Sequence, residues 1–62
     1  MKKIIRNAIR CNQCGETIVS NNLHDFVTCI CGTCSIDGGS NYLRRLAPTE
    51  EAYTDLSIVE ED

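Results

Sequence analysis

The chain carries Cys11-Asn12-Gln13-Cys14-Gly15 and later Cys29-Ile30-Cys31-Gly32-Thr33-Cys34, with 14 residues between the second and third cysteines. Closely spaced thiols in two groups, separated by about the length of a hairpin, have the spacing of a metal site. A chain of 62 residues also needs a metal ion or disulfides to stabilise it (a staple), because small domains bury too little surface to be stable by packing alone. The two cysteine groups therefore decide the expected fold.

The core that this composition can build is small. Leu, Ile, Val and Phe together number 15 of 62 residues, and Trp is absent. Such a core rarely supplies more than ~3–5 kcal/mol, whereas a structural zinc ion contributes an apparent ~10–16 kcal/mol. Disulfides are the alternative staple, but five cysteines are an odd number and the N-terminal stretch lacks the apolar run of a signal peptide. We therefore expect a cytoplasmic protein with reduced thiols.

Four of the five cysteines are needed for one tetrahedral zinc ion. Both Cys14 and Cys31 are followed by glycine, which adopts the left-handed conformation that turns backbone N–H groups toward a sulfur. This symmetry favours one structural Zn²⁺ per chain, held by four thiolates. A second ligand set replaces Cys29 by Cys34, and a site using His24 or a rubredoxin-like iron site is a further alternative. The preferred ligands are Cys11, Cys14, Cys29 and Cys31.

The strand signals predict a small, metal-stapled, mostly β fold of the zinc-ribbon type. Residues 16–20 and 25–30 are rich in β-forming residues and flank a turn, so we expect them to pair as a hairpin. Residues 35–37 suggest a third short strand, and Gly38-Gly39 a tight turn with positive φ. Residues 3–10 fit a strand leading into the first cysteines, although their apolar spacing fits a helix about as well.

The charge distribution divides the chain. Residues 1–46 carry all six Lys and Arg against three acids, whereas residues 47–62 carry six acids and no base. Thr49 followed by Glu50 and Glu51 resembles a helix start, and Ala52, Leu56 and Val59 recur at helical spacing. We expect a zinc-ribbon domain over residues 1–47 and an acidic tail over residues 48–62 with a short helix. No stretch approaches the ~20 apolar residues of a spanning helix, so no membrane partner is expected.

Two resemblances follow from these motifs. The cysteine groups resemble those of zinc ribbons over about residues 5–37, which implies the fold element and no particular function. The chain is also similar to a family of short, functionally undescribed proteins of the bacillus group and their phages, which implies a cytosolic setting and a phage origin. The matching run is Arg6-Asn7-Ala8-Ile9-Arg10-Cys11, Cys14-Gly15, His24-Asp25-Phe26-Val27, Cys29-x-Cys31-Gly32, Asp37-Gly38-Gly39 and Tyr42-Leu43-Arg44-Arg45.

The residue types point to binding and away from catalysis. An all-thiolate shell implies a closed structural metal, and the single histidine leaves no evident base for a nucleophilic cysteine. We therefore expect a non-catalytic protein-binding module, as a homodimer or as a phage inhibitor of a host enzyme or defence system. A thiol redox enzyme using the Cys31–Cys34 spacing lacks its usual context. The alternative is a nucleic-acid-binding accessory ribbon, with Arg6, Arg10, Tyr42, Arg44 and Arg45 as the contacts to nucleic acid or a partner.

Overall fold

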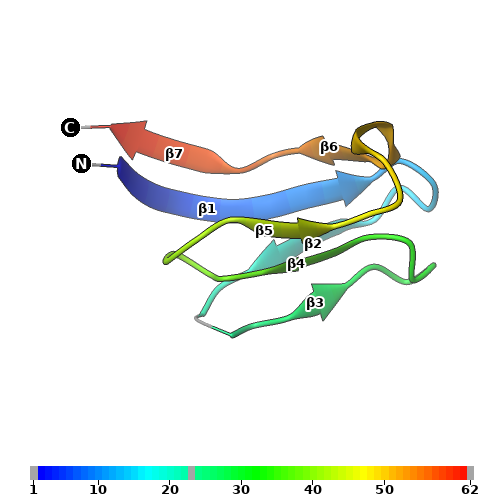
Figure 1. The fold of residues 1–62 in the computed structure, drawn as a ribbon, viewed down its shortest axis with the longest axis horizontal. Coiled ribbons are helices and arrows are strands. Elements are labelled where there is room, and N and C mark those ends of the chain that lie inside the picture. The colour runs from blue at the N-terminus through cyan, green and yellow to red at the C-terminus, as the bar shows by residue number, and fades with distance from the viewer. Residues whose placement is uncertain (1, 23, 62) are drawn as a thin grey trace.

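A computed structural model describes residues 2–22 and 24–61 of the chain. Its strands form two antiparallel sheets, one built around β1 and one in the order β3-β4-β5, and the molecule measures 35 × 20 × 16 Å. The two termini lie side by side at one end (Figure 1). The elements are β1 (Lys2–Cys11), β2 (Thr17–Ser20), β3 (Val27–Thr28), β4 (Ser35–Asp37), β5 (Arg44–Leu46), the 3₁₀ turn η1 (Glu50–Ala52), β6 (Tyr53–Asp55) and β7 (Ile58–Glu61).

The small, mostly β fold with antiparallel hairpins is confirmed. Each cysteine group forms the turn of one hairpin: residues 12–16 join β1 to β2, and residues 29–34 join β3 to β4. Residues 3–10 form a strand and not a helix, because β1 pairs with other strands on both edges. The third strand lies at the expected residues 35–37, and Gly38 and Gly39 have φ of +105° and +52°.

The hairpin predicted between residues 16–20 and 25–30 is wrong in its partners. β2 pairs with β1 in the register Asn7 to Ser20, whereas β3 pairs with β4. The tight turn at the first cysteine group brings β2 back along the ten-residue β1. In the segment that connects the two hairpins, the Ser20 hydroxyl donates to the carbonyl of Asp25 at 2.7 Å. This side-chain hydrogen bond stands where the predicted hairpin would have had backbone strand pairing.

The tail also differs from the predicted helix. In the tail as described, up to residue 61, the 3₁₀ turn at Glu50–Ala52 is the only helical element, and Thr49 at its N-cap makes no side-chain capping bond. The remaining tail residues extend along one edge of β1, where β6 pairs with residues 9–11 and β7 with residues 2–6. Backbone pairing with a long strand outweighs the weak helical pattern. Among the described residues, no helix has the length and apolar character needed to cross a membrane.

The core joins the two sheets at the cysteine end. Its buried residues are Ile9, Ile18 and Ile36 together with the thiols of Cys11, Cys29 and Cys34. Half of this core is sulfur-bearing, so the chemistry of the thiols and the packing of the fold cannot be separated. On β1, residues 7, 9 and 11 point to the same face and all three are buried, as is Ala8 on the other face.

A buried polar network joins the sheets farther from the thiols. The Asn7 side chain is 1% exposed, and its Nδ2 donates to the carbonyl of Asp37 at 3.0 Å and to that of Tyr42 at 3.3 Å. Its Oδ1 accepts from Arg45 Nη1 at 3.1 Å. Arg45 Nη2 donates in turn to Asp55 Oδ1 at 2.7 Å and to the Ser57 hydroxyl. Arg45 therefore ties the tail to both sheets.

We expect the substitution Asp55→Asn to destabilise the fold slightly. Burial raises the pKa of Asp55, but the hydrogen bonds from Arg45 and Ser57 and the charge of Arg45 together outweigh it and hold the pKa below the ordinary 3.8. The carboxylate therefore contributes stability above about pH 4 that is lost as the pH falls through the folded-state pKa. Because this side chain is 55% exposed, the contribution is about 0.5 kcal/mol or less. Denaturant unfolding should give the same difference in free energy of unfolding between the wild type and Asp55→Asn from pH 5 to pH 8. A difference that has already vanished at pH 5 would contradict this prediction.

Candidate metal centre

The first cysteine group is a tight turn at the end of β1. The Gly15 N–H donates to the carbonyl of Cys11 at 2.8 Å, and the Cys11 N–H donates to the carbonyl of Glu16 at 2.9 Å. Gly15 has φ of +78°, a left-handed conformation that glycine adopts without strain. The turn therefore directs the side chains of Cys11 and Cys14 to the same side.

The second cysteine group repeats this construction with one residue fewer. The Gly32 N–H donates to the carbonyl of Cys29 at 2.9 Å, and Gly32 has the same φ of +78° as Gly15. The Cys29 N–H donates to the carbonyl of Cys34 at 3.0 Å, which closes the hairpin behind the turn. Both cysteine groups lie at the end of the molecule opposite the termini (Figure 1).

Four sulfur atoms meet between the two turns. The Sγ atoms of Cys11, Cys14, Cys29 and Cys31 all lie within 4.8 Å of one another. Cys31 Sγ is 3.6 Å from that of Cys11 and 3.5 Å from that of Cys29. A tetrahedral ion with Zn–S bonds near 2.3 Å requires sulfur atoms about 3.8 Å apart. The donor set and its spacing therefore fit one metal ion, and zinc is the ion for which this geometry is typical.

Hydrogen bonds favour the thiolate form on the second turn. The Cys34 N–H donates to Cys29 Sγ at 3.3 Å and lowers the pKa of Cys29. In the thiol form Cys31 Sγ–H donates to Thr33 Oγ1 at 3.2 Å. Once the sulfur is deprotonated, hydrogen bonds from the Thr33 hydroxyl and N–H favour the thiolate and lower the pKa of Cys31 to about 6. Metal binding requires deprotonated sulfur, so these donors prepare the second turn for an ion.

Cys34 is the one cysteine outside the four-sulfur cluster. Its side chain is fully buried, its Sγ–H donates to the carbonyl of Ala52 at 3.5 Å, and burial raises the pKa of its thiol. The alternative ligand set with Cys34 in place of Cys29 is thus not the set that the structure brings together. Cys34 instead packs with Ile9 and Ile36 behind the cluster.

Two polar contacts between the turns were not predicted from the sequence. Glu16 Oε1 accepts from the Ile30 N–H at 2.6 Å, and the Thr33 hydroxyl donates to Gln13 Oε1 at 3.1 Å. Both contacts join the first cysteine group to the second across a large separation in sequence. Nothing in the local pattern of Glu16 or Gln13 indicates this role, which depends on how the hairpins meet.

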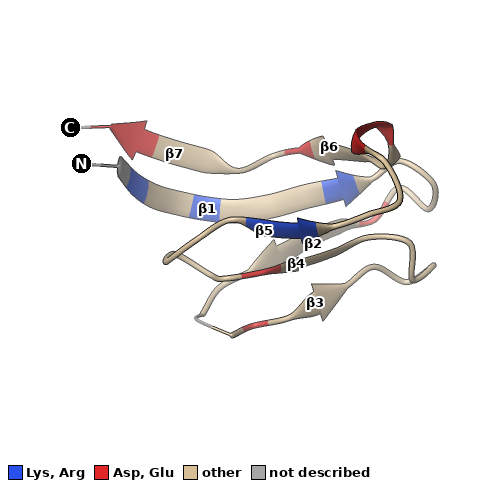
Figure 2. Ribbon diagram, in the orientation of Figure 1, with Lys and Arg blue, Asp and Glu red and all other residues tan. Residues whose placement is uncertain are grey.

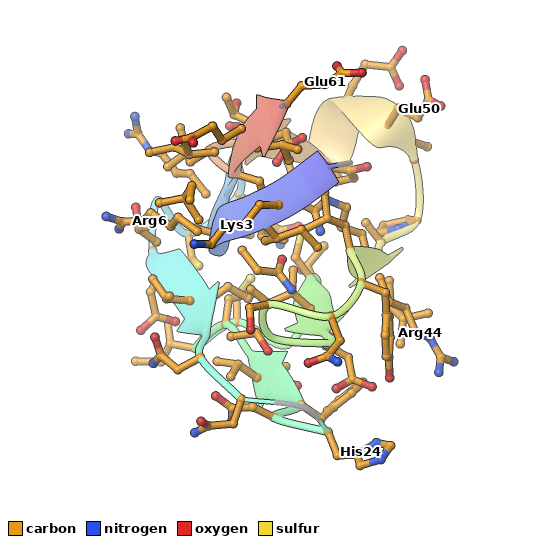
Figure 3. All side chains as sticks on the ribbon, turned by 90° about the vertical axis from the view of Figure 1, so that its left-hand side faces the viewer. Lys3, Arg6, His24, Arg44, Glu50 and Glu61 are labelled. Atoms are coloured by element: carbon orange, nitrogen blue, oxygen red, sulfur yellow. The ribbon has the colours of Figure 1, made fainter. Side chains whose placement is uncertain are left out.

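His24 and the candidate contact residues lie elsewhere. His24 is exposed with φ of +65°, points away from the molecule (Figure 3) and does not belong to the four-sulfur cluster. Arg6 and Arg44 point away from opposite sides of the molecule (Figure 3), while Arg10 is exposed on β1. The Arg45 side chain is only 12% exposed and is engaged in the internal network. Tyr42, at 38% exposure, lies beside Gly38.

The fold and the site define a small β protein whose two hairpin turns bring together four cysteines that could hold a metal ion. The chain belongs to the family described as "Domain of unknown function (DUF7695)", which it matches over residues 3–47. No curated protein and no solved structure matches it. The expected link to bacillus-group bacteria and phages stays a prediction.

Substituting Cys29 and Cys34 in turn separates the two ligand sets. We expect Cys29→Ala to abolish stoichiometric zinc binding, because three thiolates remain in the cluster. Cys34→Ala should keep one zinc per chain and lose about 1 kcal/mol of stability, the cost of a small buried cavity. Elemental analysis of the purified variants measures both. Loss of zinc in Cys34→Ala with retention in Cys29→Ala would assign the site to the other set.

Proposed function

We propose that this chain is a non-catalytic, zinc-stabilised protein-binding module. The observation that carries the proposal is the four-sulfur cluster, with all Sγ atoms within 4.8 Å of one another. An ion held by four thiolates has no open position for a substrate or water, so its role is to stabilise the fold. The module then acts through the surface that the metal-bound hairpins present.

Exposed apolar side chains support a role in protein binding. Large apolar side chains that stay exposed are candidate contacts for a partner protein. In the described part of the chain several strand edges are unpaired, which suits pairing with another chain. Among the described residues, the large apolar side chains with the highest exposure are Ile5, Phe26, Ile30 and Ile58, at 51%, 54%, 84% and 53%.

The partner class follows from the setting that the sequence implies. In a cytoplasm that keeps the thiols reduced, the partner is a second copy of the chain or a host protein. For a phage-encoded chain, the host protein is an enzyme or a defence protein that the module inhibits. Nucleic acid is the less supported partner, since Arg45 is engaged internally and Arg6 and Arg44 point to opposite sides (Figure 3).

Native mass spectrometry of the protein purified from its natural host tests this proposal. The expected spectrum shows one zinc ion per chain and either a dimer or a complex with a host protein. Light scattering after size exclusion gives the oligomeric state independently. A folded protein without metal would contradict the structural role of zinc. A strict monomer with no retained protein would contradict the binding role.

A further inference from the structure

The outer edge of β7 has no strand partner in the described part of the chain. β7 pairs only with β1, and its four residues are all exposed. An unpaired edge presents backbone N–H and C=O groups that an extended peptide can bind as an added strand. Edge strands are commonly protected by charge or by proline against such pairing. Here two acidic residues, Glu60 and Glu61, provide charge of one sign only.

A groove lies beneath the β1–β7 ribbon, at the end of the molecule that carries the termini. It has a volume of about 530 Å³, within the range of ligand sites in proteins. Ile4, Leu43 and Val59 supply its apolar surface, Ser40 and Asn41 its neutral polar groups, and Glu61 its charge. Figure 3 looks onto this end, with Glu61 on β7 above Lys3 on β1.

We propose that the β7 edge, with this groove, binds an extended segment of a partner protein in which two basic residues are followed by two aliphatic ones. The proposal rests on the protein-binding function argued above and names its surface and its ligand. Val59 and Glu61 face the groove, because Val59 lines it and residues two apart in a strand share a face. Ile58 and Glu60 lie on the other face. A strand that binds antiparallel to β7 therefore passes Glu61 and then Val59 on the groove face. On the other face it passes Glu60 and then Ile58.

The chain contains its own example of such a ligand. β1 begins Lys2-Lys3-Ile4-Ile5 and already pairs with the inner edge of β7 in the register Lys3 to Glu60 and Ile4 to Val59, before a bulge at residue 5 places Arg6 opposite Ile58. Opposite charges and aliphatic pairs across strands are the stabilising combinations. Antiparallel pairing of β7 with β7 of a second copy over the same four residues would instead place Glu60 and Glu61 opposite Val59 and Ile58 of that copy, with no opposite charges across the strands. The charge of the edge thus favours a basic partner over self-association.

The test uses the peptide Lys-Lys-Ile-Ile-Arg-Asn-Ala-Ile, which repeats residues 2–9, added at millimolar concentration to the zinc-bound, ¹⁵N-labelled full chain at low salt. The expected result is amide shifts at residues 58–61 and at the groove residues Ser40, Asn41 and Leu43. The double variant Glu60→Gln/Glu61→Gln should bind about fivefold more weakly, from the loss of two exposed ion pairs. Its matched control is Glu50→Gln/Glu51→Gln, which changes the net charge equally on η1 and should bind like the wild type.

Several results would overturn this proposal. Shifts confined to the edges of β2 or β3, equal weakening in both double variants, or no binding at all would each do so. Large shifts at residues 2–6 would mean that the peptide displaces β1, and concentration-dependent shifts without peptide would mean that a second copy occupies the edge. If native mass spectrometry retains a host protein but the peptide causes no shifts at β7, the proposed protein-binding function stands. The binding surface would then lie elsewhere on the molecule.

Discussion

Removal of the metal ion from the purified protein is expected to unfold the chain. The core contains three isoleucines, and its other buried members are cysteines, of which Cys11 and Cys29 belong to the four-sulfur cluster. Packing at this size contributes ~3–5 kcal/mol, whereas zinc bound to thiolates contributes an apparent ~10–16 kcal/mol that becomes folding free energy. We expect the two turns to separate without the ion that the four thiols are proposed to bind, because the remaining contacts are too weak to hold them together.

The measurement is a chelator titration followed by circular dichroism and by the dispersion of amide signals. Both signals should collapse together as zinc is withdrawn and return when zinc is added back under reducing conditions. The Cys14→Ser variant should behave as the metal-free chain, while Cys34→Ala should keep the folded spectrum until zinc is removed. A chain that stays folded in excess chelator would show that packing alone suffices, and that the cysteine cluster has another purpose.

The sequence pattern allowed the candidate site to be predicted more fully than the strand pairing. The glycine after Cys14 and Cys31 distinguishes four cysteines from the fifth, and these four are the ones that the structure gathers. That property is local, since a turn with positive φ is determined by a few adjacent residues. The order of strands depends on contacts far apart in sequence. From the sequence β2 could pair with β1 or with β3, and in the folded chain it pairs with β1.

The tail and the polar network could not be predicted for the same reason. Ala52, Leu56 and Val59 recur at helical spacing, yet these residues lie in or beside extended segments because β1 offers a free edge. The sequence indicates a surface cation at Arg45. In the structure its guanidinium donates hydrogen bonds to Asn7 of β1 and Asp55 of β6, which are far from it in sequence. Burial of a charged group requires partners, and those partners are visible only once the sheets are assembled.

The substitution Gly38→Ala is expected to destabilise the zinc-bound protein by about 2–5 kcal/mol. Gly38 has φ of +105°, which costs an alanine ~1–2 kcal/mol. A Cβ atom there would also overlap the carbonyl oxygen of Tyr42 and come within 2.6 Å of its ring, and such overpacking adds ~1–3 kcal/mol. That carbonyl accepts a hydrogen bond from Asn7, so its displacement also disturbs the network between the sheets.

Gly15→Ala provides the matched control, because Gly15 also has positive φ but its Cβ would meet no atom within 4 Å. The Gly15→Ala variant should lose only the ~1–2 kcal/mol of stability that positive φ costs an alanine. Denaturant unfolding of both variants at saturating zinc gives the two free energies on one scale. Equal losses would mean that the loop after Gly38 yields to the new methyl group. A larger loss in Gly38→Ala, with amide shifts at Asn7 and Tyr42, would show that the Gly38 turn holds the two sheets in register.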